Sequence, residues 1–507
     1  MRILFINFNL GSTPGINNGL ALLSSLLKKK GHDVKALFLC EDMGYGFDLK
    51  RLEKDVLGFT PDIIGLSIME PQFKYAAAFA KDAMRYYKGF ILCGGPHPTM
   101  DPEEVLASEG VDAVCVGEGE GAMLDLVKAL ESGKDHATVR NLWCKSRDGK
   151  IIKNRLRPFA DLGDLPPDDK SLFDLREIVR LKNFQLEVLL GRGCAYECAY
   201  CINKAYVDRY KTLCIDEVKV KDYVRIKNPE TVLREIGDAL SRDPAIKKIA
   251  FIDDNFLMYS SFIKEFFIRY KEEIGLPFMC NANPLSFNEE KGRLLKDAGC
   301  DDIRFGVESG SERVKKVIMN RPVSNKIVEE SFRVTKGLGL MTSSFNMIGL
   351  PTESSKEVME TLELNARILP DTVKVMTFYP FKNTTLYDMS ERLGLIDHGR
   401  KKALDSYDVA TCLKFDDHHR LFLTKVQALF NWYINIFLKN EASPEYASLV
   451  KEAEGLTESE WRSYDFLGRD KDLSARFAKK GIVHYSKFVN RSLAVKFPSR
   501  HFDLLAV

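Results

Sequence analysis

Short, continuously apolar segments alternate with amphipathic segments over the first 155 residues of the chain. Between the first two apolar segments, Leu20, Leu23 and Leu27 share one helical face, and Gly31 ends the helix after three lysines. The apolar segments are rich in branched residues, as strands buried on both faces are: Ile3–Asn7, Val34–Leu39, Ile63–Ile68, Phe90–Cys93 and Ala113–Val116. Repeats of this kind predict a doubly wound parallel sheet, which binds ligands at the carboxyl ends of its strands.

A second alternating series follows a polar stretch with prolines, Ala160–Asp174, which we interpret as a linker. Its helices have clear start signals, such as Asn228 directly before Pro229. Because six strand-helix units are too few for the eight of a closed TIM barrel, we expect an open, partial (β/α)6 barrel. Its expected strands are Leu186–Leu190, Ile249–Ile252, Phe278–Asn281, Ile303–Val307, Ser343–Ile348 and Val373–Phe378.

The pattern becomes helical from about residue 396 onward. The most apolar stretch there, Ala428–Leu438, carries two asparagines and predicts a buried helix, with a membrane-surface helix as the alternative. We find no signal-peptide pattern and no run of about 18 uncharged apolar residues, so we expect no membrane span. The sequence thus divides into a first domain at 1–158, a linker at 159–180, a second domain at 181–395 and a helical C-terminal region at 396–507.

Charge and cysteine content exclude some classes of protein. The formal net charge of +2 does not mark a nucleic-acid binder. The chain has 11 cysteines, and an odd number scattered through a long chain argues against a disulfide framework. We therefore expect a reduced, cytoplasmic protein. Most cysteines, such as Cys40 and Cys115, lie in apolar segments and are expected in cores.

Three cysteines do not fit that description. Cys194, Cys198 and Cys201 stand in C-x3-C-x2-C spacing on a glycine-bounded loop after the first strand of the second series. Soft thiolates suit zinc or an iron–sulfur cluster. A closed zinc site needs a fourth ligand, and no cysteine or histidine stands at a typical short spacing nearby. Three cysteines on a four-iron cluster leave one iron open for another ligand. Zinc and accidental core cysteines remain the alternatives.

This segment resembles the signature of the radical S-adenosylmethionine (SAM) superfamily, with Tyr200 in the aromatic position before the last cysteine. The resemblance implies that SAM chelates the open iron of a [4Fe-4S] cluster. One electron then cleaves SAM into methionine and a 5′-deoxyadenosyl radical. An electron donor such as flavodoxin or ferredoxin is implied as a partner.

Further matches follow strand ends. Asp253 and Asp254 resemble the Asp-Asp variant of a family turn that faces the SAM ammonium group, although a helix N-cap is an equally good interpretation. Glu308 and Ser309 resemble the family segment that contacts the ribose. Gly349 stands in a Gly-x-Pro sequence that resembles the segment packed on adenine, although only that part of the pattern matches.

The first domain resembles the cobalamin-binding domain of radical SAM enzymes. The similarity rests on Gly94, Gly95 and His97 after the fourth strand, and on Gly117 and Glu118 after the fifth. Glycines there would let the backbone approach a bulky cofactor. The D-x-H-x-x-G motif is absent, so any bound cobalamin should lack a histidine from that motif on cobalt. A loop histidine packed between prolines, and a degenerate domain that binds nothing, remain open.

Taken together, the resemblance implies a cobalamin-dependent radical SAM methyltransferase, similar to class B methylases, that acts on an unactivated carbon of an unidentified substrate. One alternative is a radical SAM oxidoreductase or cyclase without methyl transfer. Another is a non-catalytic iron–sulfur redox sensor, which would explain the cysteines but not Glu308 or the first domain.

Overall fold

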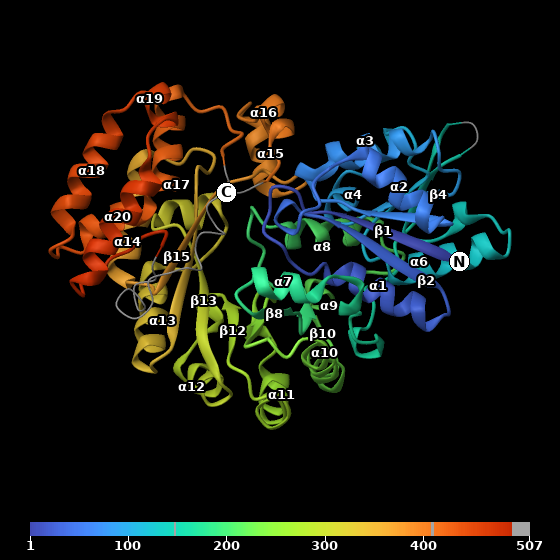
Figure 1. The fold of residues 1–507 in the computed structure, drawn as a ribbon, viewed down its shortest axis with the longest axis horizontal. Coiled ribbons are helices and arrows are strands. Elements are labelled where there is room, and N and C mark those ends of the chain that lie inside the picture. The colour runs from blue at the N-terminus through green and yellow to red at the C-terminus, as the bar shows by residue number, and fades with distance from the viewer. Residues whose placement is uncertain (147–148, 407–409, 489–507) are drawn as a thin grey trace.

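The computed structural model describes residues 1–146, 149–406 and 410–488 (Figure 1). The first domain is a seven-stranded sheet with the order β2-β1-β3-β4-β5-β6-β7. Its first five strands are parallel and confirm the predicted segments: β1 (Arg2–Phe8), β2 (Asp33–Leu39), β3 (Ile63–Ser67), β4 (Phe90–Gly94) and β5 (Ala113–Cys115). The helices around it are α1 (Asn18–Lys29), α2 (Leu49–Phe59), α3 (Phe73–Ala83), α4 (Pro96–Met100), α5 (Pro102–Ala107) and α6 (Glu120–Glu131).

Two strands at one end of the sheet were not predicted. β6 (Leu142–Lys145) and β7 (Ile151–Lys153) add to β5 in antiparallel fashion. Only a few residues join β6 to β7, and a parallel crossover needs a dozen or more, so this pair can only be antiparallel. The first domain is therefore a mixed sheet with a parallel centre.

The second domain is a curled sheet of six parallel strands, which confirms the predicted series. The order β8-β11-β12-β13-β14-β15 follows the chain, and within the described residues β8 and β15 do not pair, so the barrel stays open. The strands are β8 (Gln185–Val188), β11 (Lys248–Phe251), β12 (Phe278–Ala282), β13 (Cys300–Glu308), β14 (Met341–Ile348) and β15 (Thr372–Thr377).

Most helices of the second domain lie on the outer side of the barrel, but the helix after the cysteine loop, Ile202–Leu213, lies against the first domain (Figure 1). The predicted start at Asn228 is confirmed, because its side chain accepts a hydrogen bond from the Glu230 N–H at 3.0 Å. These helices are α7 (Leu175–Leu181), α8 (Ile202–Leu213), α9 (Val220–Tyr223), α10 (Pro229–Arg242), α11 (Ser260–Glu273), α12 (Glu289–Asp297), α13 (Asn325–Gly337), α14 (Ser355–Ile368) and α15 (Thr385–Arg392). A short ladder, β9 (Gly191–Arg192) with β10 (Arg225–Ile226), stands beside the sheet.

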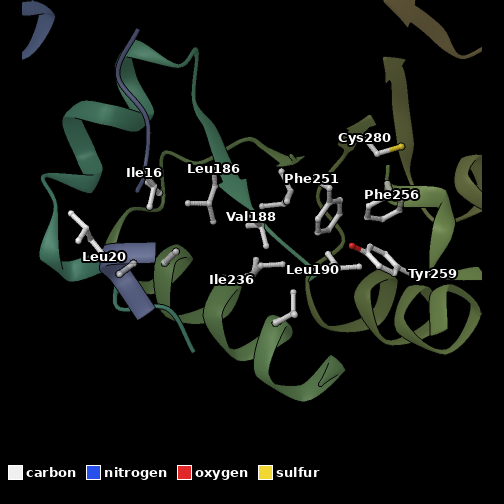
Figure 2. Packing of buried hydrophobic residues seen from close by; sticks show 14 of the residues in the cluster. Ile16, Leu20, Leu186, Val188, Leu190, Ile236, Phe251, Phe256, Tyr259 and Cys280 are labelled. Carbon is white, nitrogen blue, oxygen red and sulfur yellow. The ribbon is translucent and has the colours of Figure 1, made fainter. Parts of the chain in front are cut away.

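One hydrophobic core runs through both domains. Ile16 and Leu20 of the first domain belong to the same cluster as Leu186 of β8 and Phe251 of β11. Figure 2 shows these side chains in one continuous layer that ends at Phe256. Because the apolar faces of the two sheets share this core, the domains are packed together as a single unit.

Helix α8, which follows the cysteine loop in sequence, packs into the core of the first domain. Tyr210 and Cys214 are buried in one cluster with Val114, Val116 and Leu156. The first domain is thus completed by a helix from beyond its boundary in the sequence. This contact places the helix that follows Cys201 directly against the carboxyl end of β5.

Gly117 marks the closest point of that contact. It has φ +83°, and a Cβ there would lie 2.5 Å from the Tyr210 hydroxyl oxygen. Gly133 also has a positive φ, +62°, but has nothing within 4 Å of a Cβ. Both alanine variants place a side chain at a positive φ and share that backbone strain. Only Gly117→Ala also displaces Tyr210, so we expect it to lower the free energy of unfolding by about 1–3 kcal/mol more than Gly133→Ala does. Denaturant unfolding of the metal-free chain measures the difference; equal midpoints would contradict it.

The predicted helical region is confirmed from residue 398 to Lys479, and residues 489–507 of that prediction lie outside the described residues. It consists of α16 (His398–Ala403), α17 (Asp417–Phe437), α18 (Ser443–Gly455), α19 (Glu458–Arg462) and α20 (Phe466–Lys479). α17 packs on α14 and β15 and buries Trp432, whose Nε1 donates to Asp470 at 2.7 Å. The stretch Ala428–Leu438 is therefore a helix with its apolar face in a core. In the part of the chain that the structure describes, no helix is long and apolar enough to span a bilayer.

Candidate active site

The loop that carries the three cysteines leaves the carboxyl end of β8 and ends at α8. Asp253, at the end of β11, fixes its start, because its carboxylate accepts the N–H groups of Leu190 at 3.1 Å and Gly191 at 2.8 Å. Gly193 has φ +98°, and a Cβ there would collide with the Tyr223 carbonyl oxygen. The loop is therefore held at close range on both sides, which brings its thiols to one end of the barrel.

The three thiols gather at that end. Cys198 is buried, and Cys194 and Cys201 are partly exposed. Burial raises the pKa of Cys194 to about 11 and also raises that of Cys201, and each thiol's charge contributes further to its neighbours. Among described residues, no three His, Cys, Asp or Glu side chains are placed to hold a single metal ion. Three soft thiols on one loop suit an iron–sulfur cluster with one iron left open.

Arg321 is a site residue that the sequence did not reveal. Its Nη1 donates to Cys198 Sγ at 3.7 Å, and its Nη2 donates to the Gly306 carbonyl at 2.6 Å. Burial opposes its charge, but the neighbouring Tyr200 and Glu308 outweigh this and raise the pKa of Arg321. Nothing local marks this arginine in the sequence, since it reaches the cysteines only through the fold.

Glu308 ends β13 in a strained conformation. Its φ is +67°, and the pairing of β13 with β14 shifts register between Gly306 and Glu308. Burial raises the pKa of its carboxyl group, while Arg321 and a hydrogen bond with Tyr200 lower it. The left-handed conformation of a glutamate is unfavourable in free energy, so contacts with the surrounding structure must stabilise it. Backbone strain of this kind is concentrated at functional sites. Tyr200, Glu308 and Arg321 thus form one polar group beside Cys198.

The two aspartates after β11 have different surroundings. Asp253 is 1% exposed, and burial raises its pKa to about 7 although backbone amides stabilise its charge. Asp254 is exposed and close enough to Cys194 and Cys201 for its charge to raise the pKa of both thiols. Neither side chain caps a helix in the described structure, because α11 begins after Tyr259. The N-cap alternative is therefore not supported. Asp254 is the more exposed residue of the two, although burial of its carboxyl group raises its pKa and a hydrogen bond with Asn203 lowers it.

Ser309 and Gly349 lie behind this edge. The Ser309 hydroxyl contacts Thr361 at 3.4 Å and accepts the Ser311 N–H at 3.1 Å, so it is engaged within the protein. The Gly349 N–H donates to Glu353 at 2.6 Å, and burial raises the pKa of Glu353 to about 8. Gly349 therefore offers backbone rather than a side chain, as the resemblance to an adenine-packing segment implies.

His97 lies on the facing edge of the first domain. It is 3% exposed, and neither ring nitrogen has a hydrogen-bond partner within the described residues; Glu104 lies 3.6 Å from Nε2. Burial lowers the pKa of His97 to about 4, so its ring is neutral. It lines a small pocket between the domains, with Met69, Glu70, Pro96, Met100, Ile202, Phe381 and Lys382. Since Ile202 directly follows Cys201, this pocket adjoins the cysteine loop.

The two glycines before His97 differ in what surrounds them. A Cβ on Gly94 would meet its nearest atom only at 3.8 Å, whereas one on Gly95 would lie 3.0 Å from the Ile68 backbone. Gly94 leaves space beside the strand end, and the buried His97 ring has no hydrogen-bond partner among the described residues. Both features fit contact with a bulky cofactor. These residues therefore suit the cobalamin that the sequence predicts, on the side of the pocket opposite the cysteines.

The carboxylate of Glu118 is engaged within the protein. It accepts from Arg192 Nη1 at 2.9 Å and from Arg225 Nη2 at 2.7 Å. The Gly117 N–H donates to Thr99 at 3.0 Å. Of these loop residues His97 lines the pocket, whereas Glu118 lies against the start of the cysteine loop.

Comparisons with known proteins match the two parts of the chain to two different families. Residues 188–364 match the family model described as the radical SAM superfamily, and residues 12–127 match that of the B12 binding domain. The first match contains the cysteine loop and Glu308. The second contains both glycine loops.

Relatives share both parts. An uncharacterized methyltransferase of Pyrococcus horikoshii is 27% identical over 74% of this chain and 78% of its own. An anaerobic magnesium-protoporphyrin IX monomethyl ester cyclase of Rubrivivax gelatinosus is 23% identical over 78% of this chain and 71% of its own. The solved cobalamin-dependent SAM radical enzyme OxsB, with aqua-cobalamin and SAM bound, shares the fold: the TM-score is 0.67 at 17% identity, over 100% of this chain and 79% of OxsB. The chain therefore belongs to the radical SAM enzymes that carry a B12-binding domain.

Proposed function

We propose that the chain is a methyltransferase that uses a [4Fe-4S] cluster, SAM and cobalamin. The observation that carries the proposal is the contact between the domains, where His97 of the B12-binding domain and Ile202 beside Cys201 line the same cavity of about 10 Å³. Methyl transfer to a carbon radical needs a methyl donor and a radical source close to one substrate position. The meeting of the two parts at this point supports the proposal.

The cofactors would supply the hard chemistry: the reduced cluster cleaves SAM to a radical that removes hydrogen from carbon, and cobalamin provides the methyl group. The protein's own residues bind and orient. Cys194, Cys198 and Cys201 would hold the cluster, and Arg321 stabilises the charge of the Cys198 thiolate through its 3.7 Å contact.

SAM would be held by groups at three strand ends. The exposed Asp254 carboxylate suits the SAM ammonium group, and Glu308 suits the ribose hydroxyls, since both accept charge-assisted hydrogen bonds. Tyr200, which hydrogen-bonds to Glu308, would orient that carboxylate, and Gly349 would lie beside adenine as in the family segment that it resembles. Asp253 and Ser309 would support the site from behind, since their polar atoms are engaged within the protein.

On the facing side, Gly94, Gly95 and His97 would contact cobalamin. We also propose an electron donor such as flavodoxin or ferredoxin and a cytoplasmic location, in line with the one-electron chemistry and reduced thiols. The substrate class is left to experiment.

The half-reaction of cobalamin with SAM tests methyl transfer without knowledge of the substrate. The full chain, reconstituted anaerobically with iron, sulfide and hydroxocobalamin, is reduced with titanium(III) citrate and given SAM with a deuterated methyl group. We expect S-adenosylhomocysteine and the label in the cobalamin fraction, together with 5′-deoxyadenosine. A cyclase or oxidoreductase would give 5′-deoxyadenosine without S-adenosylhomocysteine, and that result would reject methyl transfer. A redox sensor would cleave no SAM at all.

A further inference from the structure

The turn after β5, Gly117–Glu120, reaches the cysteine loop directly. Glu118 accepts hydrogen bonds from Arg192 at 2.9 Å and from Arg225 at 3.0 and 2.7 Å. Glu120 accepts from the other terminal nitrogen of Arg192 at 2.6 Å. Two carboxylates of the B12-binding domain therefore hold one guanidinium of the radical SAM domain in a fixed orientation.

Arg192 stands at the start of the cysteine loop, so this contact bears on the position of the cysteines. Arg192 lies between Gly191 and Gly193, two residues before Cys194, and pairs in register with Arg225 in the β9–β10 ladder. Glu118 thus bridges both register partners of the ladder. On the opposite side, Asp253 accepts the Gly191 N–H at 2.8 Å. The start of the cysteine loop is therefore held between a carboxylate from each domain.

These charges are largely withdrawn from water. The side chains of Glu118, Arg192 and Arg225 are 11%, 27% and 13% exposed. Burial alone would raise the pKa of Glu118, but the two arginines outweigh it and lower the pKa. Removal of one partner from such a network leaves an uncompensated charge in a low-dielectric region. This destabilises the folded state.

The same turn contacts the loop that carries His97. The Gly117 N–H donates to Thr99 Oγ1 at 3.0 Å, and Thr99 Oγ1 donates to the Gly95 carbonyl at 2.9 Å. α8 closes the connection, since Tyr206 contacts Thr99 at 3.2 Å and the Glu118 N–H donates to Tyr210 at 2.8 Å. A continuous set of hydrogen bonds thus joins the edge of the His97 pocket to the cysteine loop.

We propose that Glu118 is a positioning residue, which fixes the cysteine loop from the B12-binding domain and couples the two cofactor sites. It acts through Arg192 and touches neither reacting atoms nor, in this arrangement, the pocket. The inference rests on the two cofactor sites and not on methyl transfer, so a failure of the labelling experiment would leave it standing.

The variant Glu118→Gln tests the proposal in the full chain. Glutamine keeps the shape but removes the charge, so Arg225 loses its neutralising carboxylate and Arg192 keeps only Glu120. In the metal-free protein we expect faster amide hydrogen exchange at residues 191–201, with the strands β1 to β5 still protected. In the reconstituted protein we expect a more positive midpoint potential of the cluster, because loss of a nearby negative charge favours the reduced form.

Matched variants separate positioning from general stability. Glu103→Gln removes the carboxylate of an exposed pair, 2.7 Å from Lys153 in the same domain, and should change neither exchange nor potential. Glu118→Gln with Arg225→Gln restores the charge balance and should return the potential toward the wild-type value. If Glu118→Gln does not fold, Glu118→Asp keeps the charge and should loosen the loop while the potential stays unchanged.

Coupling itself is measured with hydroxocobalamin. Retention of cobalamin is first established by absorbance for each protein, which tests the cofactor assignment separately. Bound cobalamin should slow exchange at residues 191–201 in the wild type and have little effect there in Glu118→Gln. Equal exchange and equal potential in Glu118→Gln and wild type would overturn the positioning role. An equal effect of cobalamin on both proteins would overturn the coupling.

Discussion

Replacement of Cys194, Cys198 and Cys201 together by alanine is expected to leave the protein without iron and sulfide after anaerobic reconstitution, and without SAM cleavage. The three thiols lie on one short loop and would supply all protein ligands of the cluster, so no other described side chains are placed to substitute for them. Iron and acid-labile sulfide analysis, with the absorbance of the cluster, measures the loss.

A matched control uses a cysteine outside the loop. Cys280 is fully buried on β12, and Cys280→Ala should assemble the cluster normally. If the triple variant retained a full complement of iron and sulfide, the assignment of the metal site would be wrong. Loss of the cluster in Cys280→Ala as well would show that the assay reports general misfolding.

Glu308→Gln is expected to retain the cluster and bind SAM more weakly. A carboxylate accepts charge-assisted hydrogen bonds worth about 1.5–3 kcal/mol each, which corresponds to roughly 10- to 150-fold in affinity for one such bond. Glutamine accepts more weakly and also leaves the buried Arg321 with less compensation. Equilibrium binding of SAM to the reconstituted, oxidised protein measures the effect.

The control for this prediction is Glu330→Gln, which removes an exposed carboxylate 2.6 Å from Arg333 on α13. It should bind SAM as the wild type does. Unchanged affinity in Glu308→Gln, with a full cluster, would remove Glu308 from the SAM site. A parallel fall in iron content would instead assign it a structural role beside Cys198.

The parallel strands could be predicted because a strand that is buried on both faces consists of consecutive apolar residues. A segment such as Ile63–Ser67 is apolar at nearly every position, and only a strand between two layers needs that pattern. β7 was missed because an edge strand has a weaker pattern, with Ile151 exposed and Ile152 only half-buried. β6 was missed although it is buried, because its apolar run is only three residues long, Leu142–Cys144. Their antiparallel pairing follows from the short connection rather than from composition.

The parallel strands of both sheets and the three cysteines could be predicted because strand burial and ligand spacing depend on neighbouring residues. The contact of Arg321 with Cys198, the engagement of Asp253 with the Gly191 N–H and the pairing of Glu118 with Arg192 became visible only in the folded chain. Each of these contacts joins segments far apart in the chain. Their geometry depends on how the two sheets pack through a shared core, and no local pattern of residue types specifies that packing.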